Sequence, residues 1–119
     1  MIENIHNNIK CNLGEGLAVN NDLNSYSWVD IYHKKIYLVK NRSSDVLEYD
    51  YPYIPSNIFY FDECKALILD NYGISEFSWI DSSLVRYFDF SSELFDKNFR
   101  GNDGVKVDKD TFIFGSMHI

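Results

Sequence analysis

The sequence has few of the residues that define the most easily recognised classes of site. It contains only two cysteines, Cys11 and Cys64, which form no CxxC pair and are too few for a secreted disulfide scaffold. We therefore expect both to be reduced thiols in ordinary packing roles. The three histidines, His6, His33 and His118, show neither HxH nor HExxH spacing, so the sequence predicts no histidine-based zinc site.

Basic clusters and long apolar runs are missing as well. The net charge is −7, and binding to a polyanion needs a basic face that releases counterions, so nucleic acid is not an expected partner. No apolar run approaches the roughly 20 residues that cross a bilayer, so no membrane association is expected. Residues 1–6 lack the positive start and apolar stretch of a signal peptide, which makes a cytoplasmic location the default expectation.

Aromatic residues, in contrast, are abundant. Nine Tyr, nine Phe and two Trp make up 17% of the chain and fall in short alternating runs, which favours strands. Helical periodicity is nearly absent, because apolar residues alternate or form short runs bounded by Asn, Asp, Ser and Gly. The sequence therefore predicts an all-β chain over residues 1–119. Strands are expected at residues 17–20, 25–32, 35–40, 46–51, 56–61, 66–71, 75–80, 84–88 and 111–117.

The expected strands repeat along the chain. Asp22, Asp62 and Asp108 each precede an apolar strand, at spacings of 40 and 46 residues. A period of this length that holds four short strands is typical of propeller blades, which are small antiparallel sheets stacked on their neighbours. A β-sandwich of roughly 100 residues also has seven or more short strands. Periodicity alone therefore leaves a propeller and a sandwich open.

Two motifs are more specific than the repeat. Residues 11–17 read CNLGEGL and are followed by YSWVDI at residues 26–31; residues 100–104 read RGNDG and are followed by FGSM at residues 114–117. In order and spacing they resemble the family of gluconolactonase, regucalcin (senescence marker protein) and luciferin-regenerating enzyme. That family has Leu-Gly-Glu-Gly-Pro, Trp-Val-Asp-Ile, Arg-x-Asn-Asp-Gly and Gly-Thr-Met. The resemblance extends over nearly the whole chain from about residue 11.

The resemblance implies a six-bladed β-propeller, of which the chain supplies about two and a fraction blades of four antiparallel strands. It implies one divalent cation (Ca²⁺, Zn²⁺ or Mg²⁺) in the central channel and hydrolysis of sugar lactones or related esters. Glu15 is then a metal ligand, Arg100 and Asn102 face the substrate, and Met117 lines the site. Asp103 either lines and orients the site or is structural and ties the turn together. The remaining ligands and the general base of the family come from later blades, so no catalytic residue is expected in this chain.

Residue chemistry alone offers a plainer interpretation of each position. Glu15 lies between two glycines, where a bent backbone can present a carboxylate to a hard cation, or can simply form an exposed turn. Residues 102–104, Asn-Asp-Gly, form an ordinary turn sequence by themselves. Arg100 is either a surface charge or a fork of donors for a sugar oxygen. Met117 is either a channel residue or core filling.

Other positions carry structural expectations. Trp28 and Trp79 are expected to pack between blades, and Asp30 and Asp70 to be turn or strand-end residues. Residues 105–110 are expected to form the turn after the second motif. Leu17 stands where the family has Pro, which suggests a divergent member.

Length sets a further constraint. Six blades of about 40–45 residues need roughly 250 residues, and the chain has 119. Three explanations of the short length are open. The chain is a truncated product or part of a longer enzyme, or it is an inactive relic, or several copies assemble into one ring. Unpaired strand edges predict self-association. We expect a lactone hydrolase family member with little activity as this chain alone, or alternatively a non-catalytic β-rich binding or assembly module.

Overall fold

The computed structural model describes residues 6, 8–90 and 98–118, and these form strands joined by turns and loops, without a helix. Consequently, in the described ranges no helix is long and apolar enough to cross a membrane. The all-β prediction is confirmed. The strands are β1 (Gly14–Asn20), β2 (Ser25–Asp30), β3 (Lys35–Val39), β4 (Leu47–Asp50), β5 (Asn57–Phe61), β6 (Lys65–Leu69), β7 (Gly73–Ser78), β8 (Leu84–Asp89), β9 (Phe99–Asp108) and β10 (Thr111–His118).

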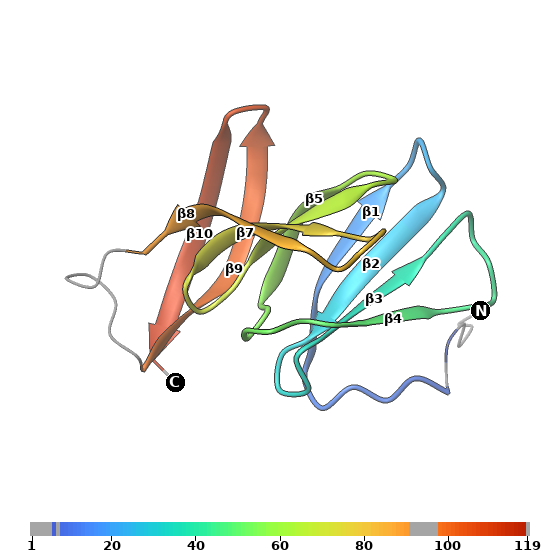
Figure 1. Ribbon diagram of the computed structural model, residues 1–119, viewed down its shortest axis with the longest axis horizontal. Helices are drawn as coiled ribbons and strands as arrows, with labels where there is room; N and C mark the ends of the chain where they lie inside the picture. The colour runs from blue at the N-terminus through green and yellow to red at the C-terminus, as the bar shows by residue number, and fades with distance from the viewer. Residues whose placement is uncertain (1–5, 7, 91–97, 119) are drawn as a thin grey trace, which may run out of the picture.

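The strands form three antiparallel sheets in chain order. β1 to β4 make the first four-stranded sheet, β5 to β8 the second, and β9 pairs with β10 in the third. Figure 1 shows the three sheets following one another across the molecule. The first strands of the sheets are neighbours, because β5 lies beside both β1 and β9. This is the arrangement of successive blades around a common axis.

Strands β5 to β7 of the second sheet are largely buried on both faces. One face packs against the first sheet in a core that includes Ile68 and Phe77 of the second sheet and Ile36 of the first. The other face contributes Phe59 and Leu69 to a core shared with β9 and β10. Burial on both faces explains why β5 and β6 read as nearly continuous apolar runs, whereas a sheet with one solvated face shows alternation.

β9 is the strand that the sequence analysis missed. The turn expected at residues 102–104 is wrong, since β9 runs through it. The turn expected at residues 105–110 is shorter than predicted, because β9 continues to Asp108 and the chain turns at Lys109 and Asp110. Within β9, the pairing with β10 shifts so that Asn102 and Asp103 together lie opposite Gly115. This β-bulge accommodates the turn-forming residues inside a strand.

The two tryptophans occupy different places. Trp79 lies in the core between the first two sheets, as predicted for packing between blades. Trp28 alternates with the buried Val29 and lies on the other face of the first sheet, where it stacks on Tyr37 with ring centroids 5.2 Å apart. Burial and the nearby Glu48 raise the pKa of Tyr37 to about 12. Trp28 therefore does not pack between the described sheets.

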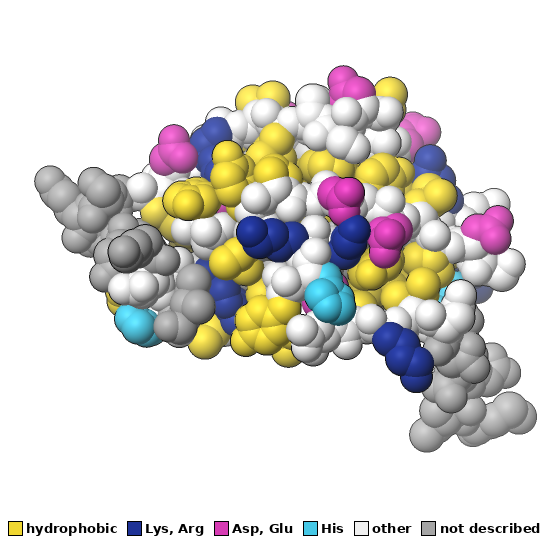
Figure 2. Space-filling view, turned by 60° about the horizontal axis from the view of Figure 1, so that its bottom comes forward, with side chains coloured by type: hydrophobic (Ala, Val, Ile, Leu, Met, Phe, Trp, Pro, Cys, Tyr) yellow, Lys and Arg dark blue, Asp and Glu magenta, His cyan; other side chains and the backbone are white. Residues whose placement is uncertain are grey.

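Large hydrophobic side chains also remain exposed, as Figure 2 shows for one face of the molecule. Most of them lie on β1, β8, β9 and β10. Exposed examples include Leu17, Val19, Tyr60, Val85, Tyr87, Phe88, Val105, Val107 and Ile113.

A buried carboxylate ends the second strand of the second sheet. Asp70 is fully buried, and its Oδ1 accepts hydrogen bonds from the backbone N–H groups of Tyr72 (2.7 Å) and Gly73 (3.0 Å). Its Oδ2 accepts a bond from the Tyr51 hydroxyl at 2.6 Å, and Arg86 Nη1 lies 2.9 Å from its Oδ1. Burial and the Asp70 charge raise the pKa of Tyr51, which therefore stays a neutral donor. Asp70 is a strand-end residue, as predicted, and it joins three segments.

Replacing Asp70 with Ala is expected to lower the free energy of unfolding by about 3 kcal/mol, since Arg86, Tyr51 and two N–H groups lose their acceptor. Urea denaturation measures this change. Asp89→Ala is the control, because Asp89 also contacts Arg86 (3.4 Å) but is 76% exposed. Asp89→Ala is expected to lower the free energy of unfolding by less than about 1 kcal/mol. Equal losses in the two variants would contradict a special role of the buried carboxylate.

Candidate functional site

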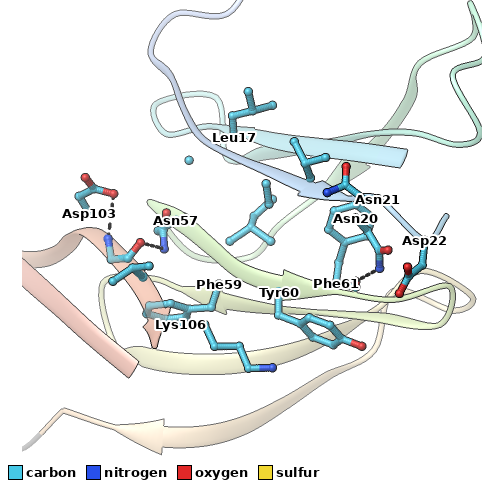
Figure 3. A pocket seen from close by; sticks show the side chains of 16 residues that line it. Leu17, Asn20, Asn21, Asp22, Asn57, Phe59, Tyr60, Phe61, Asp103 and Lys106 are labelled. Atoms are coloured by element: carbon cyan, nitrogen blue, oxygen red, sulfur yellow. Dashed lines mark hydrogen bonds between the residues drawn. The ribbon is translucent and has the colours of Figure 1, made fainter. Parts of the chain in front are cut away.

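The first strands of the three sheets line one groove. β1 and its turn contribute residues 16–22, β5 contributes residues 57–61, and β9 contributes residues 103–106, around a volume of about 680 Å³. In Figure 3, Asn57 and Asp103 lie at one end of this groove, and Asn20 and Asp22 lie at the other. We call these the site end and the far end.

Each first strand contains a β-bulge. The irregularities lie at Gly16 and Leu17 in β1, at Phe59 in β5, and at Asn102 and Asp103 in β9. A bulge puts one extra residue into a strand and turns the following side chains to new directions. Side chains around the groove therefore do not follow a simple alternation along the sequence.

Glu15 lies on β1, exposed, immediately before Gly16. Gly16 has a φ of 63°, and a Cβ added there would lie 3.0 Å from the Cα of Asn57. Glycine at this position thus allows both the left-handed backbone and the close approach of β1 to β5. Together with Cys11 and Trp28, Glu15 lines a second hollow of about 450 Å³, which shares Gly16 and Leu17 with the groove.

The segment leading to Glu15 is held by the buried carboxylate of Asp30. Its Oδ2 accepts a hydrogen bond from the Asn12 N–H at 2.8 Å, its Oδ1 accepts one from the Leu13 N–H at 3.0 Å, and its Oδ2 lies 2.9 Å from His33 Nδ1. Burial alone would raise the pKa of Asp30, but the N–H groups and the His33 charge outweigh it and lower the pKa. Asp30 is thus the strand-end residue that was predicted, and it stays ionised.

Arg100 and Asn102 are brought together on β9. Arg100 is only 6% exposed, so its interpretation as a surface charge is wrong. Its Nη1 donates to the Gly101 carbonyl at 2.9 Å and to Asn102 Oδ1 at 3.2 Å. Met117 lies opposite Arg100 in the β9–β10 pair and is 40% exposed, so it is not core filling. The substrate-facing role of these residues stays a prediction.

Asp103 and Asn57 meet at the site end. Asp103 is exposed, and its Oδ1 accepts a hydrogen bond from the Gly104 N–H at 2.8 Å. Asn57 is buried and donates from Nδ2 to the Gly104 carbonyl at 3.0 Å. Asn57 was not among the site residues predicted from the sequence. The signal that could have found it is its position as an amide inside the otherwise apolar start of β5.

Oxygen atoms dominate the possible metal donors on and beside Gly16, Asn57 and Gly104. Glu15 and Asp103 carry carboxylates, and Asn57 carries an amide carbonyl. Oxygen ligands of this kind suit Ca²⁺ or Mg²⁺, whereas Zn²⁺ is commonly bound by nitrogen and sulfur ligands. The Asn102 carbonyl already accepts a bond from Arg100. In the part of the chain that the structure describes, no three His, Cys, Asp or Glu residues are grouped to hold a metal ion. The donors fit a hard cation in kind, but do not complete a coordination shell.

Replacing Gly16 with Ala is expected to cost about 2 kcal/mol of unfolding free energy, because the left-handed backbone is strained with a Cβ and the Asn57 backbone cannot move aside easily. Gly115→Ala is the control, since a Cβ on Gly115 meets no atom within 4 Å. We expect that change to stay within about 0.5 kcal/mol of wild type. Thermal denaturation of both variants checks the difference, and a neutral Gly16→Ala would contradict the close approach of β1 to β5.

Comparison with known proteins agrees with the arrangement of the sheets. The chain matches the family model described as SMP-30/Gluconolactonase/LRE-like region over residues 13–119. No curated protein sequence matches it.

Two solved structures are similar to the chain. One is regucalcin, a calcium-binding protein from Agrobacterium tumefaciens str. C58, with a TM-score of 0.79 and 20% identity over 91% of this chain and 36% of that chain. The other is luciferin-regenerating enzyme, with a TM-score of 0.77 and 21% identity over 92% of this chain and 38% of that chain. The chain thus spans little more than a third of either structure, and at these identities the likeness establishes the fold. Because the family model matches nearly all of the sequence, the chain belongs to the SMP-30/gluconolactonase/LRE-like family.

Proposed function

We propose that the chain contributes to a metal-dependent hydrolase of gluconolactone-type sugar lactones. In this proposal Glu15 is a ligand of a divalent cation, and Arg100 and Asn102 contact the substrate. The observation that carries it is the meeting of three first strands at the site end, where Asn57 contacts both Gly16, next to Glu15, and Gly104, next to Asp103. Family membership supports the reaction class, and the similarity to a calcium-binding protein supports the cation.

Arg100 is well suited to hold an oxygen-rich substrate. Its guanidinium is planar and permanently charged, so fixing Nη1 between the Gly101 carbonyl and Asn102 Oδ1 also fixes the direction of its other N–H groups. Donors held in this way can bind a lactone or sugar oxygen without reorganisation.

The same hydrogen bond orients Asn102. Since Asn102 Oδ1 accepts from Arg100, the NH₂ group of the amide is turned away from Arg100. Asn102 is exposed, so this NH₂ group is a donor for a substrate oxygen that develops negative charge. Arg100 and Asn102 then act as one donor pair.

A divalent cation, when bound, supplies Lewis-acid polarisation of the lactone carbonyl and a water of lowered pKa. Glu15 would hold this cation through its carboxylate, and the neighbouring Gly16 lets the backbone of β1 come close to β5. Ca²⁺ takes about six to eight oxygen ligands, so a partial set of donors predicts weak binding.

Calcium titration tests the role of Glu15. We expect the chain to bind Ca²⁺ with a Kd of about 10⁻⁴–10⁻³ M, and Glu15→Gln to abolish the binding because the ligand charge is removed. Glu63→Gln is the matched control, since Glu63 is an exposed carboxylate in the turn between β5 and β6. Isothermal titration calorimetry measures the Ca²⁺ affinity of the wild-type chain and of the two variants. Unchanged affinity in Glu15→Gln would contradict the proposal and favour the non-catalytic module, for which the exposed hydrophobic side chains of β8 are the supporting observation.

The chain alone is expected to hydrolyse glucono-δ-lactone little or not at all, because the described donors do not complete a metal site. A pH-stat assay with Ca²⁺, Mg²⁺ or Zn²⁺, compared with the rate without protein, measures this. Robust metal-dependent turnover would show that the chain holds a sufficient site by itself.

A further inference from the structure

Asn57 occupies the contact between the two bulges that carry the proposed site. It begins β5 and is 4% exposed. On one side its Nδ2 donates to the Gly104 carbonyl of β9 at 3.0 Å. On the other side, a Cβ on Gly16 of β1 would lie 3.0 Å from the Asn57 Cα and 3.4 Å from its Oδ1. Asn57 thus bonds to β9 through its side chain and lies closely beside Gly16 of β1.

Both of these neighbours are glycines beside functional candidates. Gly16 follows Glu15, and Gly104 follows Asp103. A Cβ on Gly104 would lie 2.6 Å from the Phe59 ring and 3.0 Å from the Ile113 carbonyl. A Cβ on Gly16 would therefore crowd the Asn57 backbone of β5, and a Cβ on Gly104 would crowd the Phe59 ring of β5 and the neighbouring β10.

We propose that Asn57 is a positioning residue that sets the separation between the β1 bulge with Glu15 and the β9 bulge with Asn102 and Asp103. The meaning of this separation rests on the proposed function, whereas the coupling of the bulges rests on the contacts of Asn57 alone. In this role Asn57 acts through Gly16 and Gly104.

The amide is specifically suited to this position. The Gly104 carbonyl needs a donor, which an Asn side chain supplies and an Asp carboxylate does not. Because Asn57 is buried, its side chain has little freedom to move, and a displacement of either bulge changes where the donors at the site end lie.

Asn20 provides a matched control at the far end of the groove (Figure 3). Its Nδ2 donates to the Phe61 carbonyl of β5 at 2.8 Å. The bond is of the same kind as that of Asn57, because a side-chain amide of one first strand reaches the backbone of the next. Asn20 is less buried than Asn57, and its Oδ1 also accepts a bond from the Leu23 N–H at 3.2 Å, so Asn20→Ala reports the loss of such an amide bond away from the site end.

Amide hydrogen exchange of the chain without added cation tests the coupling. In Asn57→Ala we expect exchange at least about tenfold faster at residues 16–18 and at residues 101–104 together, because both bulges lose the same support. In Asn20→Ala these amides are expected to stay within about twofold of wild type. Faster exchange at only one bulge, or equal effects of the two substitutions, would overturn the proposal.

Calcium titration of the same variants tests what the coupling does. Asn57→Ala is expected to raise the Ca²⁺ Kd about tenfold, as is usual when the residue that orients a metal ligand is lost. Asn20→Ala should leave Kd unchanged. Asn57→Gln, which keeps the donor, should restore part of the affinity. Wild-type affinity in Asn57→Ala would overturn the positioning role. A wild-type chain that binds no Ca²⁺ would overturn the proposed function instead, and hydrogen exchange would still decide whether Asn57 couples the bulges.

Discussion

A buried carboxylate at the end of the second strand organises each four-stranded sheet. Asp30 binds the N–H groups of residues 12 and 13, which lead into β1, and Asp70 binds the hydroxyl of Tyr51, which lies before β5. A buried anion without donors is strongly destabilising, so the approach to each first strand is tied to the end of a second strand. The Asp70 carbonyl also accepts a bond from the Gly101 N–H in β9, which links the third sheet to the second.

The first strands can line a groove only because their backbones come close together. Gly16 and Gly104 leave room on the two sides of Asn57, and Gly101 leaves room for Leu69, whose side chain would lie 2.4 Å from an added Cβ. Bulges in all three strands turn side chains away from regular alternation. Close approach and bulges together allow polar side chains from separate sheets to meet at one end of the groove.

The first two sheets share one four-stranded arrangement, and the first strand of each of the three sheets carries different polar groups. β1 offers the carboxylate of Glu15, β5 the amide of Asn57, and β9 the donor pair of Arg100 and Asn102. The scaffold can therefore be common to a family while the chemistry depends on a few polar side chains of the first strands. The chain spans little more than a third of its structural relatives, which agrees with a donor set that is incomplete among the described residues.

Local patterns in the sequence determined most strands, the antiparallel blades and the motifs around Glu15 and Arg100, because alternation and turn residues act over a few neighbouring positions. Tertiary structure decided the rest. β9 is a strand despite its Asn-Asp-Gly sequence because pairing with β10 and contact with β5 outweigh turn propensity. Arg100 is buried, and Asn57 reaches Gly104, 47 residues later, only because three sheets pack side by side. Such contacts depend on packing between distant segments, which no local pattern encodes.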